Sequence, residues 1–219
     1  MGEALEIPPI EAAQALPRLR WRLAQGTDAG ARVTAEEVPV ALVHDGSTTA
    51  VMMASPADLE DFAVGFSLTE GVVASLADIG GLEVAASDLG VEVRMWLAPQ
   101  RAAQVAARRR RLAGPTGCGL CGVESLAEAV RPVAAVGGEL SVSSGEIMAA
   151  MEALAPLQAL NRETHAVHAA AFWRRGEGIM LVREDVGRHN ALDKLAGALA
   201  RARIDGGSGM LLLTSRVSV

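Results

Sequence analysis

The sequence predicts an α/β protein with a smaller α/β part over residues 33–113 and a larger one over residues 125–219. Three observations predict this fold class. Strand-like segments, in which apolar and polar residues alternate, are followed along the chain by helix-like segments, in which apolar residues recur every three or four positions. Two predicted helices follow serines that suit an N-cap, and glycine-rich turns separate the segments. Half of the residues are hydrophobic, which is enough for a core.

The smaller part follows a segment without a clear pattern. Residues 1–32 mix prolines, charges and a QGTDAG turn, and we expect them to form a loosely ordered lead-in. A hairpin comes next: Val38, Val40 and Leu42 alternate, Asp45-Gly46 is a tight-turn signal, and residues 50–53 return as the partner strand.

A helix is predicted to follow the hairpin. Ser55 suits its N-cap, Pro56 its first turn, and Asp58 completes a capping box. Gly71 is a natural stop for this helix. Residues 90–98 then alternate and predict a strand whose inward-facing residues are Val91, Val93, Met95 and Leu97.

Helix and strand patterns continue to alternate in the larger part. Ser143 and Glu146 predict a second capping box at the start of a helix. Strands are predicted within residues 165–175, 176–184 and 210–215, and a helix is predicted over residues 189–203.

Charge and hydropathy exclude several classes of partner. The net charge of −6 disfavours a nucleic-acid or anionic-membrane surface. No apolar run approaches the length of a membrane span, and the first residues do not resemble a signal peptide. We therefore expect a cytoplasmic protein without a nucleic-acid or membrane partner. In that compartment paired cysteines are more typical of redox, metal or sulfur chemistry than of a structural disulfide.

The stretch GPTGCGLCGVES, residues 114–125, holds the two cysteines of the chain, Cys118 and Cys121. Its four glycines and Pro115 predict a mobile loop over residues 114–124. A zinc site would need two histidines as further ligands, and none has the usual spacing. A thioredoxin-type dithiol would begin a helix, which fits this sequence only loosely. The sequence favours a sulfur carrier, which needs a nucleophilic thiolate on an exposed, mobile loop.

Four arginines, Arg108 to Arg111, precede this loop and have two interpretations. Their positive charge would stabilise a thiolate or persulfide anion on the loop. Alternatively, they lie at the C-terminus of a helix, where basic residues are favourable by themselves.

The second unusual stretch is VREDVGRHNALDKLAG, residues 182–197. Its polar residues would bind an anion or a ribose at a helix N-terminus, or form a corner at a subunit interface. Alternatively, they make a hydrogen-bonded corner in which Asp185 caps the helix and Lys194 is solvated. His168 is likewise either a core histidine or a ligand-binding residue, for which the three alanines after it leave room.

These motifs together resemble the FdhD/NarQ family of formate dehydrogenase accessory sulfurtransferases. The resemblance rests on GCGLCG after an Arg-rich segment, then HAAA, then REDVGRHNALDK, with EEVPVAL and DLEDFAVGFSLTEGVV upstream. It runs from about residue 33 to the last residue. It implies a cytidine deaminase-like fold for residues 125–219 and a homodimer.

The resemblance also implies a function. The protein would accept sulfur from a cysteine desulfurase as a persulfide and transfer it to the molybdenum or tungsten bis(molybdopterin guanine dinucleotide) cofactor that formate dehydrogenase requires. Cys118 would carry the persulfide, and Cys121 would help or relay. The expected contacts to the cofactor's guanine nucleotide arms, for which a free guanine nucleotide would be a mimic, are His168, Arg188, His189 and Asn190.

We expect no structural metal. A deaminase zinc site cannot be built here, because His189-Asn190-Ala191 lacks the glutamate and residues 215–218 lack the cysteines of that site. Two alternatives to a sulfurtransferase remain. One is a chaperone that binds the cofactor while the cysteines only gate or ligate it. The other, less favoured, is a zinc-stabilised module that uses both cysteines and two histidines.

Two departures from the family pattern stand out. His165 follows Thr164 where relatives carry a glycine, which puts the local turn in question. The sequence also ends at SRVSV, where relatives continue with another helix, a strand and a tail that helps to hold the nucleotide. We therefore expect residues 125–219 to lack the usual C-terminal part of the domain and to bind the cofactor weakly.

Overall fold

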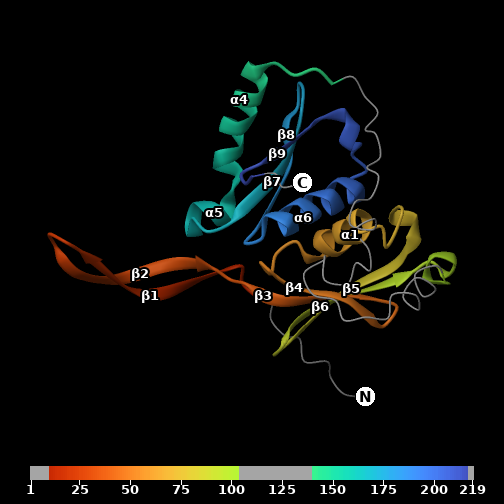
Figure 1. Cartoon of the computed structure of the whole chain (residues 1–219), viewed down its shortest axis with the longest axis horizontal. Coiled ribbons are helices and arrows are strands. Elements are labelled where there is room, and N and C mark those ends of the chain that lie inside the picture. The colour runs from red at the N-terminus through yellow and green to blue at the C-terminus, as the bar shows by residue number, and fades with distance from the viewer. Residues whose placement is uncertain (1–9, 104–139, 217–219) are drawn as a thin grey trace, which may run out of the picture.

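The computed structural model describes residues 10–103 and 140–216. Within these ranges two β-sheets lie on opposite sides of a pair of helices, α1 and α6, which pack against each other (Figure 1). A long β-hairpin extends away from both sheets. No helix in the described ranges is long and apolar enough to cross a membrane.

The first sheet has the order β4-β3-β6-β5 and belongs to the smaller predicted part. Its strands are β3 (Val38–His44), β4 (Ser47–Ala54), β5 (Ile79–Ser87) and β6 (Gly90–Leu97), and only the β3–β6 pair among them is parallel. Helix α1 (Leu59–Thr69) packs on it through the fully buried Phe62 and Ala63. The predicted Asp45-Gly46 turn and the inward face of β6 are confirmed. Strand β5 had no prediction.

The second sheet has the order β8-β7-β9 and is antiparallel throughout. It contains β7 (His168–Arg174), β8 (Gly178–Asp185) and β9 (Met210–Leu213). Helix α6 (Arg188–Arg201) covers one face, and α4 (Ser144–Leu154) covers the other. The remaining short elements are α5 (Ala159–Thr164), η1 (Leu76–Asp78), η2 (Ala155–Leu157) and η3 (Gly206–Ser208).

The capping box predicted for α4 is present. The Ser143 hydroxyl accepts a hydrogen bond from the Glu146 amide at 3.2 Å, and Glu146 Oε2 accepts one from the Ser143 amide at 2.8 Å. Arg175, which hydrogen-bonds Glu146, lowers the pKa of that carboxyl to about 2, with help from Ser143. The helix start is therefore fixed by local contacts that the sequence already indicates.

The two central helices touch backbone to backbone where two glycines meet. A Cβ atom added to Gly65 of α1 would lie 1.7 Å from the carbonyl oxygen of Asp193 in α6. A Cβ atom added to Gly197 of α6 would lie 1.9 Å from the carbonyl oxygen of Asp61 in α1. No side chain fits at either position, so these glycines set the distance between the sheets. We call this contact the glycine seam.

Two sequence-based predictions are wrong. The lead-in through residue 32 is not loosely ordered where it is described, because β1 (Ala13–Arg22) and β2 (Gly26–Ala35) pair along their whole length. Ser55 does not cap α1, which begins after Asp58 without a side-chain cap. The Ser55 hydroxyl instead accepts a hydrogen bond from the Val186 amide at 3.2 Å, because a tertiary contact replaces the local one. The domain boundaries stay predictions.

Candidate functional site

The predicted site has two parts, and the structure describes one of them. Cys118, Cys121 and the arginines before them lie outside the described residues. The HAAA and VGRHN motifs lie within them.

These two motifs meet at one corner of the second sheet. His168, the first residue of β7, pairs with Asp185, the last residue of β8. Arg188, His189 and Asn190 begin α6 just after it. His189 is exposed, His168 and Arg188 are half-buried, and Asn190 is buried. The structure therefore brings together the four residues that we expect to contact the cofactor.

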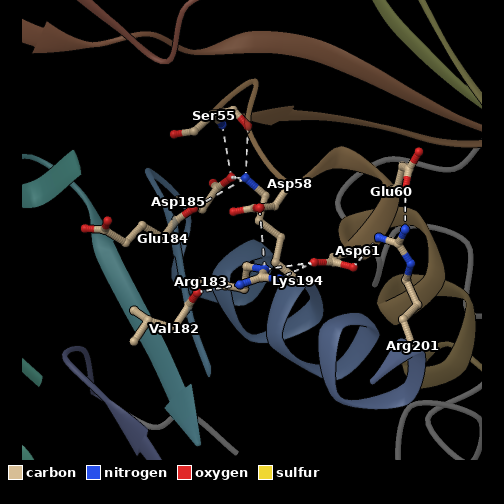
Figure 2. Close-up of polar contacts among 10 residues, drawn as sticks. All are labelled: Ser55, Asp58, Glu60, Asp61, Val182, Arg183, Glu184, Asp185, Lys194 and Arg201. Carbon is tan, nitrogen blue, oxygen red and sulfur yellow. Dashed lines mark hydrogen bonds and ion pairs between the residues drawn. The ribbon is translucent and has the colours of Figure 1, made fainter. Parts of the chain in front are cut away.

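Asp185 organises this corner. Its carboxylate is fully buried, and its Oδ1 accepts hydrogen bonds from the Gly187 amide at 2.7 Å and from Asn190 Nδ2 at 3.0 Å. Its Oδ2 accepts one from the Ser55 amide at 3.0 Å and lies 2.6 Å from Lys194 Nζ (Figure 2). Each oxygen thus has two donors, which is what a buried carboxylate needs. The prediction of a hydrogen-bonded corner around Asp185 is confirmed, but Asp185 does not cap α6: the N-cap residue is Gly187, and no side chain caps the helix.

Lys194 is buried, contrary to the expectation that it is solvated. Its side chain has no exposed surface, and its Nζ donates to the Ser55 carbonyl at 2.9 Å. Burial lowers the pKa of Lys194, although the neighbouring Asp185 carboxylate opposes that shift. The lysine follows Ala191 by three positions and precedes Leu195 and Ala198, all buried, so it lies on the inner face of α6. This helical spacing places Lys194 among buried residues, and it could have predicted the burial of the lysine from the sequence.

Asn190 also serves the fold. Its Nδ2 donates to the Met53 carbonyl at 2.8 Å as well as to Asp185. Gly187 leaves room for it, since a Cβ atom at that position would lie 2.9 Å from the same nitrogen. Asp185, Asn190 and Lys194 therefore tie β8 and α6 to residues 53–55 at the end of β4. This corner is therefore a second link between the two halves of the structure, besides the glycine seam.

The alanines of the HAAA motif do not leave open space. Ala169, Ala170 and Ala171 are buried. Ala170 packs with the core beneath α6, and Ala171 packs with the core beneath α4. The expectation that they leave room for a ligand is wrong, because a strand between two helices needs small residues on both faces. The neighbouring Ala169 amide donates to Thr214 Oγ1 at 2.9 Å, which ties β7 to the end of β9.

A second charged cluster crosses the same interface and was not predicted. Asp61 of α1 is buried and receives Arg183 Nη2 at 2.6 Å and Arg201 Nη1 at 2.6 Å (Figure 2). Arg201 also pairs with Glu60. These contacts join α1 to β8 and α6. Residues more than a hundred positions apart form them, so no local pattern signals the pairs.

The described corner consists of buried, hydrogen-bonded residues, with the side chains of Arg188 and His189 at its edge. Its buried charges are paired, and His189 at the first turn of α6 is exposed. Within the described ranges no cluster of histidine, cysteine, aspartate or glutamate has the arrangement of a metal site.

Comparisons with known proteins agree with this geometry. The model of the FdhD/NarQ family matches residues 35–219. A protein from Desulfotalea psychrophila, whose crystal structure is provisionally described as a formate dehydrogenase accessory protein, superposes with a TM-score of 0.64 at 21% identity. The match covers 94% of this chain and 74% of that one, and it shows a shared fold.

Relatives named sulfur carrier protein FdhD are more similar in sequence. The protein from Agrobacterium fabrum is 54% identical over 202 residues, which are 91% of this chain and 74% of that protein. The one from Bordetella petrii is 53% identical over 84% of this chain and 66% of its own length. The one from Variovorax paradoxus is 43% identical over 99% of this chain and 74% of its own length. The chain belongs to the FdhD/NarQ family.

Proposed function

We propose that this protein is a sulfur carrier that serves formate dehydrogenase, with Cys118 as the residue that carries the sulfur. The observation that supports this most strongly is the CxxC motif in a run with four glycines, in a chain 43–54% identical to proteins named sulfur carrier protein FdhD. The donor is a cysteine desulfurase, and the acceptor is the molybdenum or tungsten bis(molybdopterin guanine dinucleotide) cofactor. Thiols that work in this way need a reducing compartment, and we therefore place the protein in the cytoplasm.

Loading is a thiol–persulfide exchange. The Cys118 thiolate attacks the terminal sulfur of the desulfurase persulfide, a new S–S bond forms, and the donor cysteine leaves as a thiolate. The step needs no external oxidant or reductant, because one S–S bond replaces another. Its rate depends on the thiolate fraction of Cys118, and nearby arginines such as Arg108 to Arg111 would raise that fraction.

Cys121 then has a defined role in release. Its thiolate attacks the Cys118 sulfur, a disulfide forms between the two cysteines, and the terminal sulfur leaves as sulfide for the acceptor. The cysteine pair loses the two electrons that the sulfur gains. A cellular dithiol such as a thioredoxin would reduce the disulfide again before the next cycle.

The corner at the start of α6 is our proposed contact for the cofactor's guanine nucleotide arms. A helix N-terminus with Arg188 and His189 in its first turn would suit a phosphate group, and His168 is adjacent through its pairing with Asp185. Asn190 already supports the corner through Met53. We therefore expect Arg188→Ala and His189→Ala to weaken binding of a guanine nucleotide, which calorimetric titration measures. Asn190→Ala should also lower the melting temperature, because Asn190 bonds Met53 and Asp185.

The decisive test compares three chains in a strain that lacks this protein. Cys118→Ala should abolish formate dehydrogenase activity while guanine nucleotide affinity stays within about twofold. Cys121→Ala should still load sulfur but release it poorly. A Cys118→Ala protein that restores client activity would show that the protein acts as a cofactor-binding chaperone instead.

A further inference from the structure

Ser55 is a buried residue that the proposed function does not use. It belongs to the first half of the fold, which is the first sheet with α1, and it directly follows β4. The sequence predicts it as the N-cap of α1, but no described side chain caps that helix. Its polar groups bond instead to the corner at the start of α6, at least 130 positions later in the chain. The serine therefore has a role other than helix capping.

All three polar groups of Ser55 bond to that corner. The amide donates to Asp185 Oδ2 at 3.0 Å, and the carbonyl accepts from Lys194 Nζ at 2.9 Å (Figure 2). The hydroxyl accepts a hydrogen bond from the Val186 amide at 3.2 Å. Ser55, Asp185 and Lys194 have no exposed surface, so water cannot replace a partner that is lost. One residue of the first half thus holds a carboxylate, an ammonium group and a backbone amide of the second.

The turn that Ser55 holds lies between two regular elements. Strand β8 ends at Asp185 and α6 begins at Arg188, so Val186 and Gly187 form the turn. The Val186 amide bonds the Ser55 hydroxyl, and the Gly187 amide bonds Asp185 Oδ1 at 2.7 Å. Because β8 has ended and no described side chain caps α6, these two hydrogen bonds fix the direction in which α6 leaves the sheet. Ser55 supports both of them, since its own amide holds the same carboxylate through Oδ2.

The direction of this turn determines where the proposed nucleotide contacts lie. The first turn of α6 carries Arg188 and His189, the proposed contacts for phosphate groups. Hydrogen bonds to a phosphate weaken steeply when the donor moves away from its best distance and angle. A change in the turn before α6 would displace both side chains together. Affinity for the nucleotide should therefore depend on Ser55, although a fully buried serine is not accessible to a ligand.

We infer that Ser55 is a positioning residue for the guanine nucleotide: through the Val186 amide, its hydroxyl holds the turn that presents Arg188 and His189. The inference rests on the proposed function, because it needs the nucleotide to bind at this corner. It adds a residue of the first half to a site that is otherwise built from motifs of the second half. The effect is reciprocal, since a nucleotide that binds the ordered turn stabilises the Ser55 contact that orders it.

The chain offers a matched control in Ser67. This serine is also fully buried, and its hydroxyl contacts His44 Nε2 at 2.8 Å and the Ala63 carbonyl at 2.6 Å, both within the first half. Ser55→Ala and Ser67→Ala each remove one buried hydroxyl, and each should lower the melting temperature by about 4 °C. If Ser55 were only structural, the two variants would behave alike in every other measurement.

Calorimetric titration of the full chain with guanosine diphosphate separates the two roles. We expect Ser55→Ala to bind about tenfold more weakly than the wild type, and Ser67→Ala to bind within about twofold of it. In an Arg188→Ala chain the loss caused by Ser55→Ala should shrink to about threefold, because only His189 is then left to position. Unchanged affinity in Ser55→Ala, equal weakening by Ser67→Ala, or an undiminished loss in the Arg188→Ala chain would overturn the inference alone. A wild type that does not bind the nucleotide would overturn it together with the proposed nucleotide site.

Hydrogen exchange measured by NMR tests the same contact without a substitution. The Val186 amide, which bonds the Ser55 hydroxyl, should exchange at least about fivefold more slowly when guanosine diphosphate is bound. The control is the Val73 amide, which bonds the Ser67 carbonyl at 2.9 Å and should exchange at the same rate with and without the nucleotide. Unchanged exchange at Val186 in protein that binds the nucleotide, or equal slowing at Val73, would overturn the inference.

Discussion

At the glycine seam, α1 and α6 approach so closely that a single methyl group would lie within 2 Å of the opposite backbone, and buried ion pairs join the same two helices to β8. On the hairpin of β1 and β2, here called the arm, Leu19, Trp21 and Leu23 are by contrast more than two-thirds exposed. Several independent contacts fix the positions of the two central helices. The arm has a regular strand pairing, but its apolar side chains are exposed to water. The difference teaches that the packing of the central helices is complete within one chain, whereas the apolar side chains of the arm stay exposed.

The largest effect should come from the buried ion pair. Lys194→Met leaves the Asp185 carboxylate buried without its counter-charge, and breaking a buried pair in this way costs about 3–5 kcal/mol of unfolding free energy. Urea denaturation measures this change directly. Asp185→Asn in the same chain should recover part of the loss, because the buried charge is then gone. A cost below about 1 kcal/mol for Lys194→Met would show that the pair does not hold the two sheets together.

The next effect concerns the glycine seam. Gly197→Ala forces α1 and α6 apart and should cost about 3 kcal/mol, at the upper end of what overpacking costs. Gly145→Ala is the matched control, because Gly145 also lies within a helix but a Cβ atom there meets only Ser143 Oγ at 4.0 Å. The control should gain up to about 1 kcal/mol. Equal effects of the two substitutions on the melting temperature would refute the close contact.

A smaller effect depends on pH. Burial raises the pKa of Asp193, whose carboxylate accepts a hydrogen bond from Thr69 at 2.8 Å, from 3.8 to about 6. Because the folded-state pKa is the higher one, its contribution to stability is present below about pH 4 and is lost as the pH rises through 6. Asp193→Asn should therefore be more stable than the wild type by about 1–2 kcal/mol at pH 7.5 and equal to it near pH 4. A difference that stays constant over this range would contradict the raised pKa.

The smallest effect should come from the arm. In dilute protein Leu19→Glu/Trp21→Glu should change the unfolding free energy by no more than about 0.5 kcal/mol, because both side chains are exposed. Substitutions that weaken the dilute chain would mean that the arm belongs to the core after all.

Sequence patterns predicted the elements whose causes are local. The Asp45-Gly46 turn, the alternation in β6 and the Ser143–Glu146 capping box each lie within a few residues, and all three are present. Ser55 followed the same rule for an N-cap, but its amide and hydroxyl bond Asp185 and Val186, about 130 positions away. No pattern around Ser55 contains that partner.

The site residues stay predictions, and the contacts that hold their corner together were not visible in the sequence. The motifs at His168 and Arg188 lie at one corner, and the burial of Lys194 depends on Ser55, just after β4, and on Phe62 of α1. The arm was within reach of the sequence, since Pro17, Leu19, Trp21 and Leu23 alternate with arginines up to a glycine turn. An alternating segment that contains a proline does not by itself predict a hairpin, because the strength of pairing is not visible in one strand alone.

The measurement that tests the central claim most directly is peptide mass spectrometry after incubation with a cysteine desulfurase and cysteine. The proposed function predicts a gain of one sulfur on Cys118, removed by a reductant, present in Cys121→Ala and absent in Cys118→Ala. Unmodified thiols in folded wild-type protein, beside a desulfurase that loads another acceptor under the same conditions, would contradict it.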